Sequence, residues 1–261
     1  MTREASKFYP VLDDAGHPHA CILFDNIAHY RKVASRYILD GLQGNDKCMM
    51  AIDKYQRPFI AEDFAELGHE LDYYLSREQL TLIDVKKSYS RNGGFDPAKT
   101  VRIWQEETEK AVSQGYDALR VTGEATFALD SPELSEKLIY YENIMNQDLF
   151  PYFPFKSLCV YDKLLYPPDI IKEAIRAHPI LFYNDELFLH NIHYVPPNIH
   201  FQTDNQANEI DIWLDNVRQN NSNIKAVYDN ETKFREMFNN APMSYQSLDA
   251  QGNFLEVNEL W

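Results

Sequence analysis

The sequence contains little cysteine, no long hydrophobic run and no segment typical of protein export. Its three cysteines are Cys21, Cys48 and Cys159, and an odd number at wide spacing does not build a disulfide framework. No stretch of about 18 apolar residues is present, as a membrane-spanning helix would require, and the first residues lack the apolar core of a signal peptide. We therefore expect a cytoplasmic protein without a membrane partner.

Basic residues are also scarce relative to acidic ones. The chain has 25 Lys and Arg against 40 Asp and Glu, which gives a net charge of −15. Nucleic-acid binding needs clusters of basic side chains that neutralise phosphates, so this balance argues against DNA or RNA as a partner. The hydrophobic content of 44% over 261 residues suffices for the core of one large domain, or of one domain with an appendage.

Short apolar runs alternate along the chain with longer segments of helical periodicity. Runs of this length between turn residues are typical of buried strands, whereas apolar residues three and four apart are typical of helices. Strands are expected at 18–25, 47–52, 80–84, 118–122 and 157–162, with helices at 29–42, 58–74, 96–114 and 133–150. A helix at 167–177 and an edge hairpin at 180–183 and 187–190 follow. The alternation predicts a three-layer α/β domain with a mainly parallel sheet.

The composition changes after residue 202, where Gln, Asn and Asp dominate. Apolar residues at Ile210, Leu214, Val217 and Ile224 then follow heptad-like steps, which favours a coiled-coil linker. Asn221 lies in the same seam, where a polar residue can set the register. The alternative is an amphipathic helix packed against its own domain. We expect three parts, 1–203, 204–233 and 234–261, and a homodimer formed through the second.

Several separate motifs occur in a fixed order along the first part. They are His19-Ala-Cys21, Gly41-Leu-Gln-Gly-Asn-Asp-Lys-Cys48, Leu119-Arg-Val-Thr-Gly-Glu124, Tyr141-Glu142, Cys159-Val-Tyr-Asp162 and His178-Pro179. The set resembles the MEDS domain, a methanogen/methylotroph sensory domain, over about residues 17–200. The resemblance implies a ligand-sensing input domain with a RecA- or KaiC-like core. It also implies small hydrocarbon derivatives, such as methylated or halogenated one-carbon compounds, as ligands.

The last part carries a second, shorter resemblance. Residues 234–261 resemble the opening of a PAS domain, with Asn240-Ala-Pro242, a turn at Gly252 and Val257-Asn-Glu259. Strands are expected on both sides of that turn, but about 28 residues are too few for the five-stranded sheet of a PAS domain. Together the two resemblances imply the front of a sensor histidine kinase or a related two-component signalling protein, with a PAS and kinase output.

Residues with useful chemistry alternate along two of the expected strands. His19 and Cys21 share a face of the first strand, and Cys159 and Tyr161 share a face of the fifth. Imidazole, thiolate and carboxylate groups bind zinc or iron. A bound metal therefore stays one alternative, with His19, Cys21 and Cys159 as candidate ligands. The chain has no Cys-x-x-Cys or His-x-x-x-His spacing, and cysteine often serves as a small buried hydrophobe.

The ligand is expected at the carboxyl-terminal edge of the sheet. In a RecA-like strand order the first, fourth and fifth strands are neighbours, and open α/β sheets bind ligands at that edge. Gly123-Glu124 stands at the carboxyl-terminal end of the fourth expected strand, and His178 ends a helix. The candidate ligand-binding residues are His19, Cys21, Asp25, Tyr89, Glu124, Tyr141, Glu142, Cys159, Tyr161, Asp162 and His178.

Nucleotide chemistry has no motif in this chain. The phosphate-loop pattern Gly-x-x-x-x-Gly-Lys-Ser/Thr is absent, and Phe24-Asp25-Asn26-Ile27 follows the first strand instead. That loop offers no glycine for close backbone approach and no lysine for phosphates, so ATP is not expected as a cofactor. No kinase signature occurs either, and we expect a sensor and not an enzyme. Three alternatives stay open: a degenerate RecA-like nucleotide-binding protein, an enzyme acting through Cys or Glu, and a dimerising scaffold without a ligand.

Overall fold

The computed structural model describes residues 18–52, 57–84, 94–201 and 206–261. The chain divides into two compact units, the first ending at Ile210 and the second beginning at Asp211. Each unit is described by itself below. The first unit contains the α/β domain and therefore the site.

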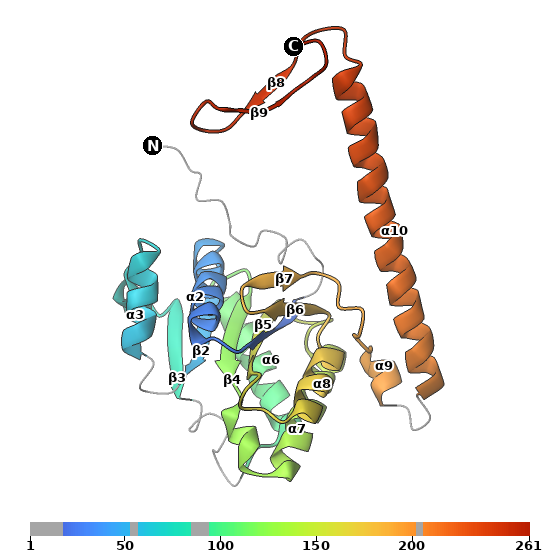
Figure 1. Ribbon diagram of the computed structural model, residues 1–261. Helices are drawn as coiled ribbons and strands as arrows, with labels where there is room; N and C mark the ends of the chain where they lie inside the picture. Colours follow the sequence, from blue (N-terminus) through green and yellow to red (C-terminus); the bar gives the residue numbers. More distant parts are fainter. Residues whose placement is uncertain (1–17, 53–56, 85–93, 202–205) are drawn as a thin grey trace. The chain divides into compact units, whose positions relative to one another are not determined.

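Seven strands form one sheet in the first unit, in the order β3-β2-β4-β5-β1-β6-β7 (Figure 1). All pairings are parallel except that of β6 with β7. This arrangement confirms the predicted α/β class with a mainly parallel sheet, and it places the first, fourth and fifth strands side by side. The strands are β1 (His19–Phe24), β2 (Lys47–Ile52), β3 (Leu80–Asp84), β4 (Leu119–Glu124), β5 (Phe155–Asp162), β6 (Ile180–Tyr183) and β7 (Glu186–Phe188).

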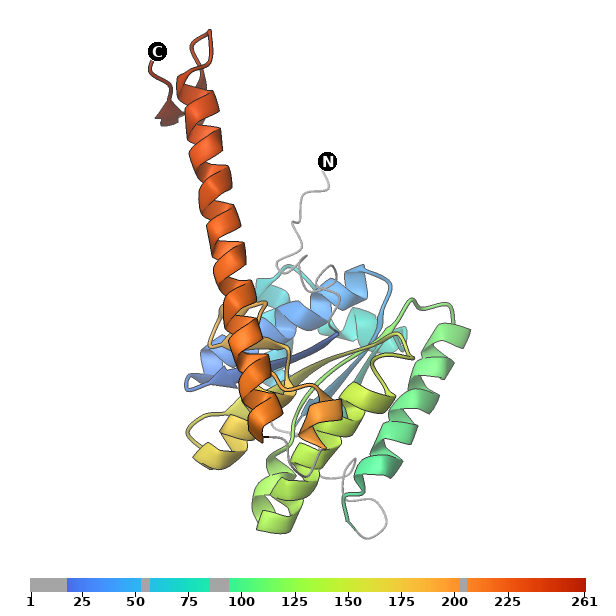
Figure 2. The ribbon, with the colours of Figure 1, turned by 90° about the vertical axis from the view of Figure 1, so that its right-hand side faces the viewer.

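Helices cover both faces of the sheet, which makes three layers (Figure 2). One face packs against α2 (Ile27–Gln43), α3 (Arg57–Glu66) and α4 (Leu71–Ser76). The other packs against α6 (Pro97–Ser113), α7 (Pro132–Asp148) and α8 (Pro168–Ala177). Because side chains alternate along a strand, each central strand contributes to both hydrophobic cores. Two short elements, the 3-10 helix η1 (Thr126–Asp130) and α9 (Pro197–His200), complete the unit.

Three of the helices begin with side-chain caps that the sequence encodes. The side chain of Asn26 accepts a hydrogen bond from the backbone of Ala28 at the start of α2, and Asp96 and Ser131 cap α6 and α7 in the same way. Such caps satisfy backbone N–H groups that have no partner inside the helix. The caps at Asp96 and Ser131 are each followed by a proline at the first helical position, where proline is favoured.

The structure differs from the predicted elements at two places that matter for the first unit. The helix expected at 58–74 is two helices, because Gly68 adopts a positive φ of 80° and the backbone N–H of His69 bonds to the carbonyl of Phe64. A glycine in the left-handed region is the common way to end a helix. The fourth strand continues to Glu124, so Gly123 and Glu124 lie within it.

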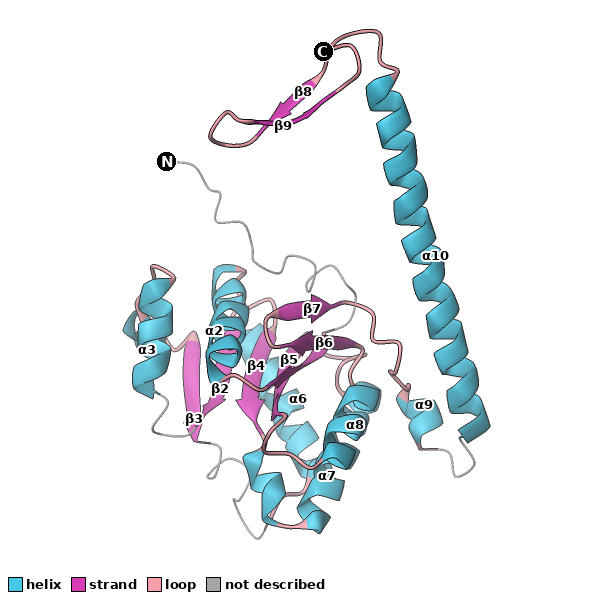
Figure 3. Ribbon diagram, viewed as in Figure 1, coloured by secondary structure: helices cyan, strands magenta, loops and turns pink. Residues whose placement is uncertain are grey.

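The second unit contains most of a long helix, α10 (Gln206–Asn239). A two-stranded hairpin of β8 (Gln246–Leu248) and β9 (Phe254–Val257) comes after that helix (Figure 3). The helix passes the boundary predicted between 233 and 234, and its first residues belong to the first unit. The hairpin forms where the PAS-like segment predicts it. Leu214, Val217 and Ile224 of α10 are each about half exposed or more, so the coiled coil stays a prediction.

A buried ion cluster fixes the α2 face of the sheet. Arg120 on β4 donates from Nε to the carboxylate of Asp46 at 2.8 Å, and Lys156 on β5 donates to the same oxygen at 3.1 Å. The Arg120 guanidinium also lies over the ring of Tyr37, 4.8 Å from its centroid. A Cβ at Gly41 would come within 2.5 Å of the Arg120 side chain, so the helix approaches this closely only with glycine there.

We expect the Asp46→Asn substitution to lower the free energy of unfolding by about 3–5 kcal/mol, because it removes the carboxylate that pairs with the buried Arg120 guanidinium. The matched control is Asp215→Asn, which breaks an exposed pair with Arg218 and should cost less than about 1 kcal/mol. Urea unfolding followed by circular dichroism measures both. Equal losses in the two variants would contradict the structural role of the Asp46 cluster.

Candidate functional site

Four side chains with metal-binding or catalytic chemistry meet on the face of the sheet that packs against α7 and α8. They are His19 of β1, Glu142 of α7, Cys159 of β5 and His178, which follows α8. One nitrogen, oxygen or sulfur atom from each lies within 4.8 Å of the corresponding atoms of the others. His19, Glu142 and His178 are at most 2% exposed, and Cys159 is partly buried. We refer to these residues as the four-residue cluster.

Glu142 lies at the centre of the contacts in this cluster. Its Oε2 is 3.2 Å from His19 Nε2 and 3.6 Å from His178 Nε2. The Cys159 Sγ lies 3.4 Å from the same oxygen and 3.5 Å from His19 Nε2. One carboxylate oxygen therefore faces two imidazole nitrogens and a thiol.

The sheet and its connections explain why these residues meet. In the parallel β1–β5 pair, His19 is opposite Ser157 and Cys21 is opposite Cys159, so all four side chains project from the same face. His178 lies two residues before the start of β6, which pairs with β1 on its other side. Strand β1 therefore has β5 on one side and β6 on the other. Helix α7 packs on this face of the sheet and places Glu142 next to His19, Cys159 and His178.

Further hydrogen bonds hold the cluster in place. Asn146 donates from Nδ2 to the carbonyl of Ala177 at 2.7 Å, so its Oδ1 is the atom that accepts from His19 Nδ1 at 2.8 Å. His178 Nδ1 donates to the carbonyl of Ala174 at 2.7 Å, and the Tyr161 hydroxyl donates to Glu142 Oε1 at 2.6 Å. Both rings and the carboxylate therefore have fixed orientations.

Burial and charge determine the protonation of the cluster. Burial lowers the pKa of His178 to about 3, so its ring is neutral at pH 7. Burial by itself would raise the pKa of Glu142, but the Tyr161 hydroxyl, and the adjacent imidazoles to the extent that they hold a proton facing the carboxylate, lower that pKa below its ordinary value. Burial and the Glu142 charge raise the pKa of the Cys159 thiol well above its ordinary value. Without a bound cation, the site therefore pairs a carboxylate with a protonated thiol.

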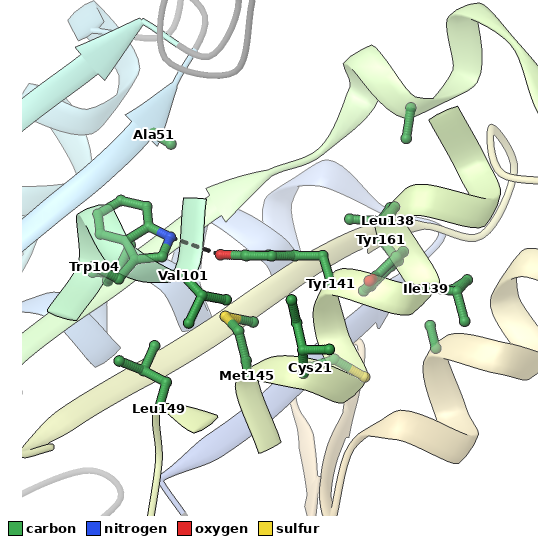
Figure 4. Packing of buried hydrophobic residues seen from close by; sticks show 14 of the residues in the cluster. Cys21, Ala51, Val101, Trp104, Leu138, Ile139, Tyr141, Met145, Leu149 and Tyr161 are labelled. Atoms are coloured by element: carbon green, nitrogen blue, oxygen red, sulfur yellow. Dashed lines mark hydrogen bonds between the residues drawn. The ribbon is translucent and has the colours of Figure 1, made fainter. Parts of the chain in front are cut away.

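A small internal cavity adjoins the cluster. Its volume is about 30 Å³, and Cys159 and Glu142 form part of its wall together with aromatic and aliphatic side chains. Figure 4 shows the core around it, where the Trp104 indole donates a hydrogen bond of 2.7 Å to the Tyr141 hydroxyl. The larger residues of the wall are Trp104, Val121, Leu138, Tyr141, Phe155 and Tyr161.

A larger hollow of about 920 Å³ lies between β3 and α6, away from the cluster. It is bordered by Gly94, and residues 85–93, which precede that glycine, lie outside the described residues. Its wall holds scattered charged residues, such as Lys99 and Glu107, and no convergent set of them among the described residues. We therefore place the candidate site at the smaller cavity, where chemically reactive groups converge.

A known protein family matches the part of the chain that contains the four-residue cluster. The MEthanogen/methylotroph, DcmR Sensory domain (MEDS) matches residues 18–179, more than half of the chain. The chain belongs to the MEDS family. A curated relative, the transcriptional repressor DcmR of Methylorubrum extorquens, is 26% identical over 168 residues. The match covers 64% of this chain and 60% of the repressor, so the chain spans less than two thirds of that relative.

Two solved structures also resemble the chain. A KaiC-like protein of Pyrococcus horikoshii has a TM-score of 0.44 at 14% identity, over 66% of this chain and 76% of its own. The flagellar accessory protein FlaH of Methanocaldococcus jannaschii has a TM-score of 0.43 at 12% identity, over 69% of this chain and 81% of its own. Within the described part of the chain, no helix has the length and apolar character needed to cross a bilayer.

The structure divides the predicted site residues of the MEDS domain into separate groups. His19, Cys159 and His178 lie in the four-residue cluster with Glu142. Two further predicted residues border it: Tyr161 bonds to Glu142, and Tyr141 bonds to Trp104.

Cys21, a candidate metal ligand in the sequence, lies outside the four-residue cluster. It lies on the same face of the sheet as Cys159, in the hydrophobic core, but it is not one of the four convergent residues. Burial raises the pKa of its thiol well above the ordinary value. Glu142 and His178, which the sequence analysis did not name among the metal candidates, converge with His19 and Cys159, whereas Cys21 does not.

The remaining predicted residues lie elsewhere, so the residues predicted for the site do not all converge at one place. Leu119 and Val121 of β4 face α7. Side chains alternate along a strand, so Glu124, three residues after Val121, faces α2 and interacts there with Tyr30. Asp162 accepts a hydrogen bond from the backbone of Leu164 in a turn. Asp25 is exposed and accepts from the Tyr183 hydroxyl at 2.9 Å. Tyr89 lies outside the described residues.

Sequence reasoning missed Asn146, which orients His19. Its signal was its position four residues after Glu142 on the expected helix, because residues four apart share a helix face. Ser157 was missed in the same way, although it is two residues before Cys159 on a strand and its Oγ lies 3.5 Å from that sulfur.

We expect the Tyr161→Phe substitution to lower the free energy of unfolding by about 1.5–3 kcal/mol, the range for a hydrogen bond to a charged group. Its hydroxyl bonds to the Glu142 carboxylate, whereas the Tyr183 hydroxyl bonds to the exposed Asp25. Tyr183→Phe is therefore the matched control and should cost clearly less, because water screens its contact with Asp25. Denaturant unfolding of both variants makes the comparison, and an equal cost would show that Glu142 does not depend on Tyr161.

Proposed function

We propose that this chain is the sensory input of a regulatory protein, in which the MEDS domain binds a small, weakly polar molecule. The observation that carries the proposal is the cavity beside Cys159 and Glu142, which combines an apolar wall with convergent polar groups. Ligand sites generally have this composition, with a few polar groups that fix the orientation of the ligand. The family and the repressor that the chain resembles support a regulatory role.

The size of the cavity restricts the class of ligand. A water molecule needs roughly 10–15 Å³ on the same scale, so a cavity of about 30 Å³ accepts a molecule of about two or three heavy atoms. Aromatic and aliphatic walls favour an apolar carbon or halogen, while Cys159 and Glu142 favour one polar group. Methylated or halogenated one-carbon compounds meet both conditions.

A route from the site to α10 supports signal relay as part of the proposal. His178 follows α8 directly, and Arg176 near the end of that helix donates to Glu209 of α10 at 2.7 Å. Glu209 is 9% exposed, so the pair is shielded from water and is stronger than a surface ion pair. In the proposed function, a ligand that binds one arrangement of α8 more tightly shifts the start of α10. The output is a kinase or a transcription-regulating domain.

The proposal does not include catalysis or nucleotide binding. The N-terminus of α2 follows β1, the position at which a phosphate would bind in a P-loop protein. Here the side chain of Asn26 already accepts the Ala28 N–H at 2.9 Å. We expect no magnesium-dependent ATP hydrolysis by the purified chain, and turnover that is lost on Asp25→Asn or Glu124→Gln substitution would favour the alternative of a nucleotide-binding protein.

Ligand binding is tested by thermal unfolding in the presence of methanol, methylamine and dichloromethane. A ligand at 100 times its dissociation constant adds about 2.7 kcal/mol to the free energy of unfolding. We expect at least one of these compounds to stabilise the natural chain and to lose that effect in Leu138→Phe, where the larger ring fills the cavity. Leu149→Phe, in the same core but outside the cavity wall, is the matched control and should retain it. Equal stabilisation of both variants would place the ligand elsewhere.

Relay through α10 predicts a dimer, because its apolar side chains are exposed in the single chain and a coiled coil would bury them. Replacing Leu214, Val217 and Ile224 by Ser should convert dimers into monomers in analytical ultracentrifugation, while the first unit stays folded. The matched control replaces Gln219 and Asn223 by Ser. A natural chain that is monomeric at tens of micromolar, or a control that dissociates equally, would count against this arrangement.

A further inference from the structure

The hydrogen bonds around the four-residue cluster determine which atoms point into it. His19 and His178 both donate from Nδ1 to oxygen atoms outside the cluster. A neutral imidazole with a proton on Nδ1 has a lone pair on Nε2. Both Nε2 atoms therefore direct lone pairs toward Glu142 Oε2, which itself offers only lone pairs. Such contacts are unfavourable unless a positive charge lies between the atoms.

A proton alone satisfies only part of this arrangement. A proton on His19 Nε2 would satisfy the 3.2 Å contact with Glu142. It would leave His178 Nε2 without a partner, and that atom is fully buried with no hydrogen bond to any described residue. A buried nitrogen without a partner costs free energy comparable to a lost hydrogen bond. A cation that contacts both nitrogens removes the deficit.

The spacing of the donor atoms fits one metal ion. A tetrahedral zinc with bonds of roughly 2.0–2.3 Å separates its ligand atoms by about 3.3–3.6 Å. Four of the six distances among these atoms are 3.2, 3.4, 3.5 and 3.6 Å, and all six are within 4.8 Å. The donor set of two imidazoles, one carboxylate and one thiolate is one that zinc accepts.

The outer hydrogen bonds also match those of metal sites. Metal-bound histidines generally donate their second ring N–H to a carbonyl or another acceptor, which fixes the ring. Asn146 and the Ala174 carbonyl accept those protons here, and the Tyr161 hydroxyl bonds to the other oxygen of Glu142. All three contacts are made by atoms that face away from the four donors.

We propose that His19, Glu142, Cys159 and His178 bind one zinc ion through Nε2, Oε2, Sγ and Nε2. Binding releases the thiol proton of Cys159 to solvent, and the two negative ligands then balance the charge of the ion. With four protein donors the site is closed, which is typical of structural zinc and not of catalysis. The inference stands on these contacts and does not depend on the proposed sensing of a small molecule.

The test uses the full chain, freed of metal with a chelator and then titrated with zinc chloride or cobalt chloride. We expect one equivalent of zinc to remain bound after dialysis, and the cobalt form to show a thiolate-to-cobalt charge-transfer band. Cys159→Ser should lose the band, whereas Cys21→Ser, which alters the neighbouring thiol on the same face, should keep it. Asn146→Ala should weaken zinc affinity about 10- to 100-fold, as the loss of an outer hydrogen bond does, and the adjacent exposed Gln147→Ala should leave it unchanged.

The natural chain alone decides the main point, even where a variant folds poorly. A folded, metal-free chain that retains no zinc after dialysis, or a cobalt form without a thiolate band, overturns the proposal. So does zinc binding that is equal in the natural chain and in a folded Cys159→Ser variant.

Discussion

A carboxylate removed from water requires compensation by positive charge or by hydrogen bonds, and Glu142 is 2% exposed in the middle of the α7 face. Its partners come from three elements besides its own: β1, β5 and the residue that follows α8. A small displacement of α7 or α8 against the sheet would remove one of those partners. The position of both helices is therefore linked to the charge of one side chain.

The two faces of the sheet solve the problem of buried charge differently. On the α2 face, Asp46 is neutralised by Arg120 and Lys156, and the ion pairs are complete within the protein. On the α7 face, the Glu142 carboxylate contacts two imidazoles and a thiol. The Nε2 atom of His178 has no hydrogen-bond partner among the described residues. An incomplete polar cluster in a core is costly. The α7 face is therefore where a cation from solution gains most by binding, and the proposed zinc belongs there, whereas the proposed small molecule would occupy the adjoining cavity.

The sequence was sufficient for the architecture because its signals were local. The alternation of apolar runs with helical periodicity predicted the strands, and Asn26, Asp96 and Ser131 mark helix starts with a chemistry that depends only on neighbouring residues. The break at Gly68 was also local and was missed. Because side chains alternate along a strand, the sequence correctly placed His19 and Cys159 on the same face of the sheet. The same rule would have placed Glu124 on the opposite face if the fourth strand had been predicted to reach that residue.

The candidate site was less predictable because its parts come from distant positions. Glu142 and His178 reach His19 through the packing of α7 and α8 on the sheet, and spacing in the sequence does not fix how far a helix is shifted along a strand. Cys21 was a candidate metal ligand because of its place beside His19, yet it is not one of the four convergent residues. Asn146 became meaningful only once Glu142 was known to face the sheet.

X-ray absorption at the zinc edge of the purified chain tests most directly whether a metal ion completes the cluster around Glu142. The account predicts one sulfur neighbour at about 2.3 Å and three nitrogen or oxygen neighbours at about 2.0–2.2 Å, with the outer-shell scattering of two imidazoles. A shell of oxygen atoms alone, or one without a sulfur neighbour, would show that zinc lies on the surface and that Glu142 is compensated by protons.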